Sequence, residues 1–235
     1  MSSKSDRYYA AIDLGTNSCR LVIADRHGKY VYKDTVSTKL GEGMFAQNKL
    51  TDEAQNRTLE CFYNFKQQID KFNVASENIR AIATASCRMA ANADEFLHKV
   101  YHETMIKLEV IGGEEEARLN LVGAMDNVKS KAGYVLIYDL GGGSTEVSLA
   151  RNAKNPEILF TISIPWGARN SSEAFGLSAY DEENAGRLRR EIYRWVDGFK
   201  NESNWNKYKD NLCVVATSST PLRLVSMVKN FGEYD

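Results

Sequence analysis

Two short segments of this 235-residue chain place an aspartate, a glycine turn and a serine in the same order. Residues 12–20 read IDLGTNSCR, and residues 138–146 read YDLGGGSTE. The two segments align with each other without a gap. Each segment follows an apolar run, so each predicts a strand, a tight turn and a second strand. Glycine lets backbone N–H groups converge on an anion, and an aspartate at the strand end can hold a hydrated divalent cation. The repeat therefore predicts a phosphate chain clamped with its metal, although an ordinary hairpin turn is the alternative for either copy alone.

The repeat defines most of the candidate site residues. The candidate phosphate ligands are Gly15, Thr16, Asn17, Ser18, Arg88, Gly141, Gly142, Gly143 and Ser144, and the candidate metal ligands are Asp13, Asp139 and Glu146. Arg20 of the first copy aligns with Glu146 of the second, which suits a divided site with phosphate on one side and metal on the other. Arginine offers phosphate a planar fork of donors. Alternatively, Arg88 is a surface helix residue and Glu146 an exposed strand acid.

Three consecutive glutamates, residues 114–116, begin a predicted helix that is entered through Gly112 and Gly113. A carboxylate beside the phosphate turns can deprotonate or orient an attacking water. The alternative is that these acids only favour the positive end of the helix dipole. From the residues alone, the second interpretation is the stronger one.

The composition narrows the class of protein. The formal net charge is -1, which indicates no general attraction to nucleic acid or to a membrane surface. The four cysteines are scattered without a C-x-x-C pair, so we expect reduced, packed thiols rather than a disulfide framework or a metal site. The N-terminus lacks the apolar stretch of a secretory signal, and no apolar run approaches the roughly 20 residues that span a bilayer. A cytoplasmic location is expected.

The order of elements also repeats. Three strands followed by alternating helices and strands occur twice, which predicts a mixed α/β sheet in each half. The predicted strands cover residues 8–14, 19–24, 30–40, 79–84, 107–111, 134–140, 144–150, 157–165 and 211–216. The predicted helices follow Thr51 as an N-cap and cover 94–103, 114–127, 181–200 and a start at 221–229. We place the domains at 1–127 and 128–235.

These residues resemble the actin, sugar kinase and Hsp70 superfamily. Together with residues 83–92 (ATASCRMAAN) and 110–119 (VIGGEEEARL), they resemble the exopolyphosphatase and guanosine pentaphosphate phosphatase (Ppx/GppA) family. The resemblance implies a duplicated actin-like ATPase (ribonuclease H-like) fold, with two mixed-sheet domains and helices around a central cleft. It also implies Mg²⁺ or another divalent cation, and removal of the terminal phosphate from polyphosphate or guanosine pentaphosphate. In this family the second glutamate of the Glu-Glu-Ala-Arg motif is the catalytic base, which corresponds to Glu116. The other two catalytic candidates come from the repeat: Arg20 as a phosphate ligand and Glu146 as a residue that could orient metal-bound water.

Two departures from the family pattern keep other functions open. Ser218 and Ser219 stand where family members usually have a glycine-rich turn, which puts nucleoside contact there in doubt. The chain ends at Asp235 where family members continue through further helices, so we expect a truncated second domain, exposed apolar surface and a homodimer. The alternatives to a phosphohydrolase are a polyphosphate- or alarmone-binding sensor without turnover and, less favoured, a sugar or acetate kinase. Neither nucleic acid nor a membrane is an expected partner.

Overall fold

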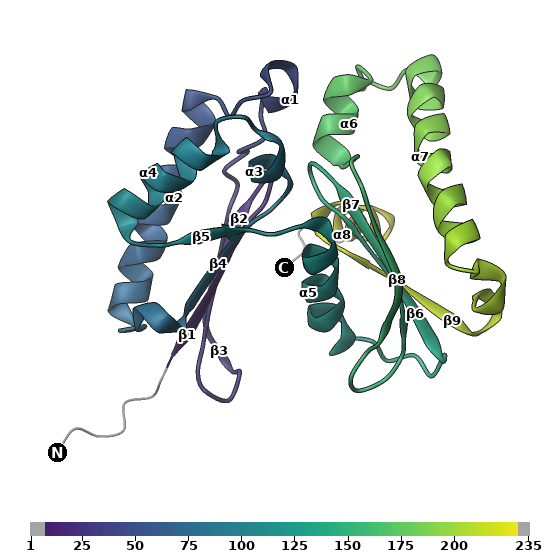
Figure 1. The fold of residues 1–235 in the computed structure, drawn as a ribbon, viewed down its shortest axis with the longest axis horizontal. Helices are drawn as coiled ribbons and strands as arrows, with labels where there is room; N and C mark the ends of the chain where they lie inside the picture. Colours follow the sequence, from purple (N-terminus) through teal and green to yellow (C-terminus); the bar gives the residue numbers. More distant parts are fainter. Residues whose placement is uncertain (1–7, 230–235) are drawn as a thin grey trace. The chain divides into compact units, whose positions relative to one another are not determined.

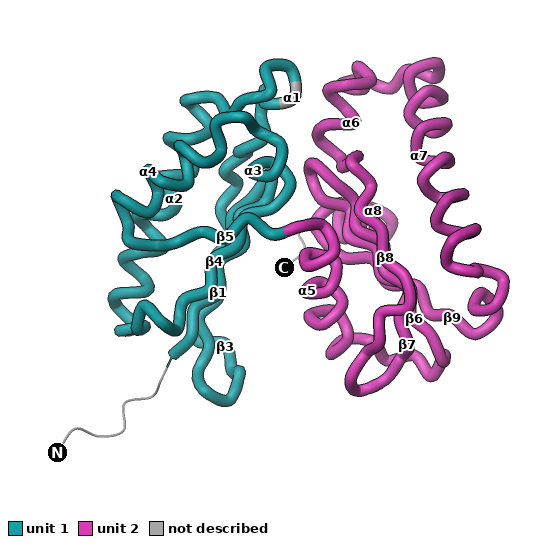
Figure 2. The backbone as a smooth tube through the Cα atoms, in the orientation of Figure 1, with its two compact units in different colours: residues 1–111 teal, residues 112–235 magenta. Residues whose placement is uncertain are grey.

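The computed structural model describes residues 8–229 of the chain and divides it into two compact units. Figure 2 shows them as residues 1–111 and 112–235. Each unit contains one mixed sheet with helices packed on it (Figure 1). The predicted fold class, a duplicated pair of mixed-sheet domains, is therefore confirmed.

The first unit has a five-stranded sheet with the order β3-β2-β1-β4-β5. Its strands are β1 (Tyr9–Leu14), β2 (Cys19–Ala24), β3 (Tyr30–Val36), β4 (Ile79–Ala83) and β5 (Leu108–Val110). Its helices are α1 (Met44–Gln47), α2 (Asp52–Lys71), α3 (Ala85–Met89) and α4 (Ala93–Thr104), with a 3₁₀ turn at Ser76–Asn78. Alternating apolar residues of β1 and β2 face the core, where they meet Phe62, Phe65 and Phe96 of α2 and α4. Thr51 is the N-cap of α2, as predicted, and its hydroxyl accepts a hydrogen bond from the Ala54 N–H.

The second unit has a four-stranded sheet with the order β8-β7-β6-β9. Its strands are β6 (Tyr134–Leu140), β7 (Thr145–Arg151), β8 (Ile158–Ile164) and β9 (Leu212–Thr217). Its helices are α5 (Gly113–Met125), α6 (Ala168–Ala174), α7 (Glu182–Glu202) and α8 (Ser219–Lys229), with 3₁₀ turns at Trp205–Lys207 and Lys209–Asn211. The buried core here is smaller, and Leu121 and Ala124 of α5 pack in it on Val135 and Ile137 of β6.

The strand registers show that the sequence repeat is a structural repeat. Asp13 is paired with Arg20 across β1 and β2, and Asp139 is paired with Glu146 across β6 and β7. In each sheet the first strand also pairs in parallel with a later strand, β4 or β9. A register shift falls at Ala24 in the first sheet and at Ala150, its aligned partner, in the second. The two sheets therefore have the same strand pairs, the same strand directions and a register shift at the same aligned position.

Two features differ from the sequence-based expectations. Helix α5 packs on β7 and β8 and belongs to the second unit, which begins at Gly112, whereas the predicted boundary at 127/128 placed it in the first domain. The short helices α1, α3 and α6 were missed, because segments of four to seven residues carry little periodicity. The expected exposed apolar surface is present in the second unit, where Val214 on β9 and Met227 and Val228 on α8 are exposed.

No helix within residues 8–229 has both the length and the apolar character needed to cross a membrane.

Candidate functional site

The first glycine turn joins β1 to β2 and has an ion pair at its base. The Gly15 N–H donates to the Ser18 carbonyl at 3.0 Å, which closes the turn. Below it, Arg20 Nη1 lies 3.3 Å from Asp13 Oδ2. Desolvation raises the pKa of Asp13 above its ordinary value, and the neighbouring Arg20 charge opposes that rise. Asp13 and Arg20, which were predicted to serve metal and phosphate respectively, are therefore bound to each other.

The loop that follows β3 holds the first glycine turn by hydrogen bonds to its carbonyl groups. The Lys39 N–H donates to the Asn17 carbonyl and the Gly41 N–H donates to the Thr16 carbonyl, both at 2.9 Å. A side chain at Gly41 would lie 2.4 Å from Thr16 Cγ2, so only glycine allows this approach. The Thr16 side chain is buried, so only its backbone N–H is left for the predicted phosphate contact, which stays a prediction.

Arg88, the remaining candidate of the first unit, lies on the short helix α3. Its Nη1 donates to the carbonyl of Ile111 at 2.9 Å. Ile111 is the residue immediately before the Gly112–Gly113 entry to α5. One of the five N–H donors of the Arg88 guanidinium therefore binds the segment that leads into α5.

In the second unit, four polar residues form a row across all four strands. Ser163 of β8 pairs with Glu146 of β7, Glu146 pairs with Asp139 of β6, and Asp139 pairs with Thr217 of β9. Paired residues project from the same face of a sheet, so the four side chains are neighbours. Glu146 is only 3% exposed and accepts a hydrogen bond from Ser163 Oγ at 2.8 Å. The row brings two predicted metal ligands, Asp139 and Glu146, side by side.

The second glycine turn is held by its carbonyl groups. The Ala168 N–H donates to Gly141 O at 2.8 Å, and the Arg169 N–H donates to Gly142 O at 2.9 Å. The amide of Asn170, which is 3% exposed, donates to Gly143 O at 2.9 Å. With the carbonyls turned toward α6, the N–H groups of Gly142 and Gly143 have no backbone acceptor among residues 8–229. The turn therefore presents N–H groups suited to an anion.

Gly167 permits this close packing. A Cβ atom there would lie 2.6 Å from backbone atoms of Gly141, Gly142 and Gly143. Backbone atoms cannot move aside as a flexible side chain can, so the approach of the 165–170 segment to the turn requires glycine. The Ser144 side chain, at the end of the turn, is 5% exposed.

Helix α5 carries the glutamates and lies on the face of the sheet that holds the polar row. Its first residue, Gly113, packs so closely on Ser163 that a Cβ atom would lie 2.5 Å from Ser163 Cβ. Glu115 forms a two-point ion pair with Arg118, with distances of 2.6 and 2.9 Å. Glu116 is half-buried, and its N–H donates to Gly112 O at 3.0 Å. Glu115 is thus held by a neighbour on its own helix.

Asn120, one helical turn after Glu116, connects α5 to the polar row. Its Nδ2 donates to Asp139 Oδ2 in a short hydrogen bond and lies 3.1 Å from Thr217 Oγ1. The Thr217 hydroxyl in turn lies 3.2 Å from Asn120 Oδ1. Residues four apart on a helix share a face, so Glu116 and Asn120 belong to the same side of α5.

The donor set of the polar row fits a hydrated magnesium ion. Among the described residues, no group of three or more His, Cys, Asp or Glu side chains could enclose a metal. Magnesium does not need such a cage, because it keeps several waters and takes one or two carboxylates with substrate phosphates. Asp139 and Glu146 supply two oxygen ligands of this kind, whereas Asp13 lies beside a guanidinium.

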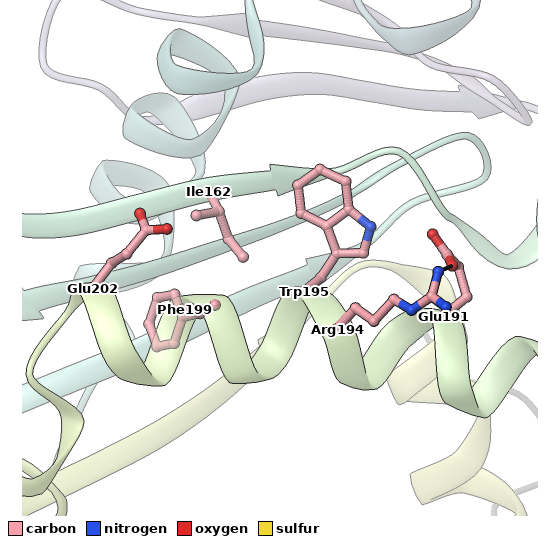
Figure 3. Close-up of a pocket in the computed structure, with 7 residues that line it drawn as sticks. Ile162, Glu191, Arg194, Trp195, Phe199 and Glu202 are labelled. Atoms are coloured by element: carbon pink, nitrogen blue, oxygen red, sulfur yellow. Dashed lines mark hydrogen bonds and ion pairs between the residues drawn. The ribbon is translucent and has the colours of Figure 1, made fainter.

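A groove of about 450 Å³ lies elsewhere in the second unit, between α7 and β8 (Figure 3). It is lined by Ile162, Glu191, Arg194, Trp195, Gly198, Phe199 and Glu202. Ile162 precedes Ser163 on β8, so the two side chains point to opposite faces of the sheet. The groove and the polar row are therefore on different faces.

Comparison with known proteins identifies the family. The sequence model of the Ppx/GppA phosphatase family matches residues 21–229. The chain belongs to the Ppx/GppA phosphatase family. A relative from Fusobacterium nucleatum, named a bifunctional 3-dehydroquinate synthase/phosphatase, is 33% identical to this Ppx/GppA chain over 246 residues. That match covers 99% of the chain and 36% of the relative, so the Ppx/GppA chain spans little more than a third of it.

Solved structures agree with this assignment. A Ppx/GppA protein from Aquifex aeolicus is 29% identical, with a TM-score of 0.70, and the match covers 97% of this chain and 72% of that one. An exopolyphosphatase from Cytophaga hutchinsonii is 22% identical, with a TM-score of 0.81, and the match covers 97% of this chain and 73% of that one. At that identity the second likeness shows the fold alone, which is the actin-like fold of Ppx/GppA proteins.

The sequence analysis did not predict the polar residues that contact the candidate site residues of this Ppx/GppA chain. Asn120, Ser163, Thr217 and Asn170 each contact a predicted site residue or turn. The spacing of Asn120 from Glu116 was a usable signal, since four residues place both on one helical face. Ser163, Thr217 and Asn170 carry no such signal, because their contacts depend on strand register and on the path of the 165–170 segment. That both glycine turns act on one phosphate chain stays a prediction.

Proposed function

We propose that this Ppx/GppA chain takes part in phosphohydrolysis, removing the terminal phosphate from inorganic polyphosphate or guanosine pentaphosphate. The supporting observation is the pairing of Asp139 with Glu146 across β6 and β7, at the base of the second glycine turn and beneath the helix that carries Glu116. Two carboxylates side by side at the end of a glycine turn are the donors that Mg²⁺ takes together with substrate phosphates. A phosphate–metal site accounts for this arrangement.

Each part of the second unit has a role in the proposed reaction. The N–H groups of Gly142 and Gly143 bind oxygens of the terminal phosphate, since backbone amides at a fixed turn favour anions. Asp139 and Glu146 hold the divalent cation, which when bound neutralises charge on the phosphate oxygens. Glu116 orients a water molecule and accepts its proton as the water oxygen attacks phosphorus. The bond from phosphorus to the bridging oxygen breaks, and the shortened chain leaves with that electron pair.

The first unit contributes positive charge in this proposal. Arg20 and Arg88 remain the proposed phosphate ligands, and the Asp13 carboxylate orients Arg20 through their 3.3 Å ion pair. We therefore assign the cation to Asp139 and Glu146 and assign Asp13 to Arg20. Asp139 and Glu146 are paired across β6 and β7, and Mg²⁺ takes one or two carboxylates placed in this way. A cytoplasmic location and a homodimer stay predictions.

Phosphate release tests the proposal directly. Polyphosphate and guanosine pentaphosphate are supplied separately to wild-type chain and to the Glu116→Gln variant, with Mg²⁺ and with a chelator, while binding is measured in parallel. Magnesium-dependent release that is lost in the variant, with binding retained, supports the hydrolase. Binding without release by the wild type makes the chain a sensor. Neither binding nor release of either compound rejects both functions.

A further inference from the structure

Asn120 makes the contact that connects the proposed base helix to the proposed metal ligands. Its side chain extends from α5 to Asp139 on β6 and to Thr217 on β9, within the second unit. An amide nitrogen has two N–H groups, and here it has two acceptors, the Asp139 carboxylate and the Thr217 hydroxyl. A carboxylate only accepts, so Nδ2 of Asn120, rather than Oδ1, must face Asp139.

We propose that Asn120 is a positioning residue, which turns the Asp139 carboxylate toward Glu146 and holds α5, with Glu116, at a fixed height above the sheet. This inference rests on the proposed function only in taking Asp139 and Glu146 as cation ligands. A hydrogen bond to one carboxylate oxygen restricts rotation of the group, so the other oxygen is directed to the cation. Such partners of metal ligands commonly change metal affinity by about 10- to 100-fold when they are removed.

Thr217 orients Asn120 in the same way. Its hydroxyl lies 3.1 Å from Asn120 Nδ2 and 3.2 Å from Asn120 Oδ1, and also 3.4 Å from the Tyr138 carbonyl. Thr217 is paired with Asp139 across β6 and β9, so its hydroxyl is held by the sheet itself. The strands thus fix Thr217, Thr217 fixes the Asn120 amide, and the amide fixes Asp139.

The test combines a metal-binding measurement with kinetics. Mn²⁺ binding to the metal-free chain is measured by calorimetry and by electron paramagnetic resonance for wild type, Asn120→Ala, Thr217→Val and Thr217→Ser. Val122→Ala is the matched control, since Val122 lies on α5 with 51% of its surface exposed. We expect Asn120→Ala to weaken Mn²⁺ binding by about tenfold. Thr217→Val should weaken Mn²⁺ binding by a smaller factor. Thr217→Ser, which keeps the hydroxyl, should bind Mn²⁺ as tightly as the wild type.

The kinetic measurement separates positioning from general damage. The Mg²⁺ concentration for half-maximal phosphate release should rise by about tenfold in Asn120→Ala, while kcat at saturating Mg²⁺ changes much less. A double-mutant cycle of Asn120→Ala with Asp139→Asn, followed by urea unfolding, should show that the two side chains are coupled in the metal-free chain. A variant that is merely less stable would lose unfolding free energy without a selective change in Mn²⁺ affinity.

The outcomes distinguish this inference from the proposed function. If wild type binds Mn²⁺ and Asn120→Ala binds it less tightly, but no phosphate is released, the inference stands and the proposed function fails. If Asn120→Ala and Val122→Ala bind Mn²⁺ with the same affinity, the inference is overturned, whether or not phosphate is released. Absence of Mn²⁺ binding by the wild type also overturns it.

Discussion

Arg20 and Asp13 are directly opposed on β2 and β1, with Nη1 3.3 Å from Oδ2, and this pair has an altered counterpart in the second sheet. At the equivalent level of β6 and β7 the partners are Asp139 and Glu146. The duplication has kept the aspartate and exchanged its partner from a cation to an anion. The two turns therefore have the same aspartate and differ in the residue paired with it.

Replacing Glu116 with glutamine should reduce phosphate release by about 10²- to 10⁴-fold, because the side chain loses its basic oxygen but keeps its size. Binding of the phosphate chain should change little, since the loss falls on the transition state. The measurement is release and binding for the same preparations. Glu115→Gln is the control, because Glu115 is paired with Arg118 and should tolerate the change. Equal loss in both variants would argue against Glu116 as the base.

Replacing Glu146 with glutamine should remove the stabilisation that a bound metal gives to the wild type. Glutamine keeps an oxygen that can accept from Ser163, so that bond is retained. Added Mg²⁺ should raise the melting temperature of the wild type and not of the variant. Thermal unfolding of both, with Mg²⁺ and with chelator, checks this; a wild type unaffected by Mg²⁺ would contradict it.

Replacing Gly167 with alanine should damage the second glycine turn. The added Cβ meets three backbone atoms at 2.6 Å, so the segment or the turn must move. Such overpacking typically costs about 1–3 kcal/mol, and phosphate binding should fall with it. The matched control is Gly123→Ala on α5, where a Cβ meets nothing within 4 Å. That change should stabilise the chain by about 0.5–1 kcal/mol, because alanine is the better helix former. Urea unfolding of both variants distinguishes the two effects.

Thiol reactivity should be confined to Cys213. Cys19, Cys61 and Cys87 are buried, while Cys213 is half-buried on β9. Burial raises the pKa of Cys87 to about 12 and that of Cys19 well above its ordinary value. A raised pKa means that the reactive thiolate is scarce at pH 8 and increases only as the pH approaches 12. A thiol reagent should therefore modify one group per native chain at pH 8 and four after denaturation. Rapid labelling of Cys87 in the native chain would contradict the described packing.

The sequence by itself determined the repeat, the succession of strands along the chain and the types of residue at both glycine turns. The register pairs Asp13–Arg20 and Asp139–Glu146 follow from a strand, a turn and a strand of matched length, which is local information. The Thr51 N-cap and the bounds of β2 and β6 were likewise predictable from local pattern. The role of Glu116 came from resemblance to the family and that of the metal ligands from the repeat, and both roles stay predictions.

Only the tertiary structure decided how these local pieces are supported. It assigned α5 to the second unit, since packing of Leu121 and Ala124 on β6 depends on contacts that the helix pattern does not specify. It separated Glu115, held by Arg118, from Glu116 one residue later. It also brought Asn120 to Asp139 and Thr217, residues 19 and 97 positions away along the chain. Hydrogen bonds between distant residues depend on strand register and helix docking together, and neither is written in a short stretch of sequence.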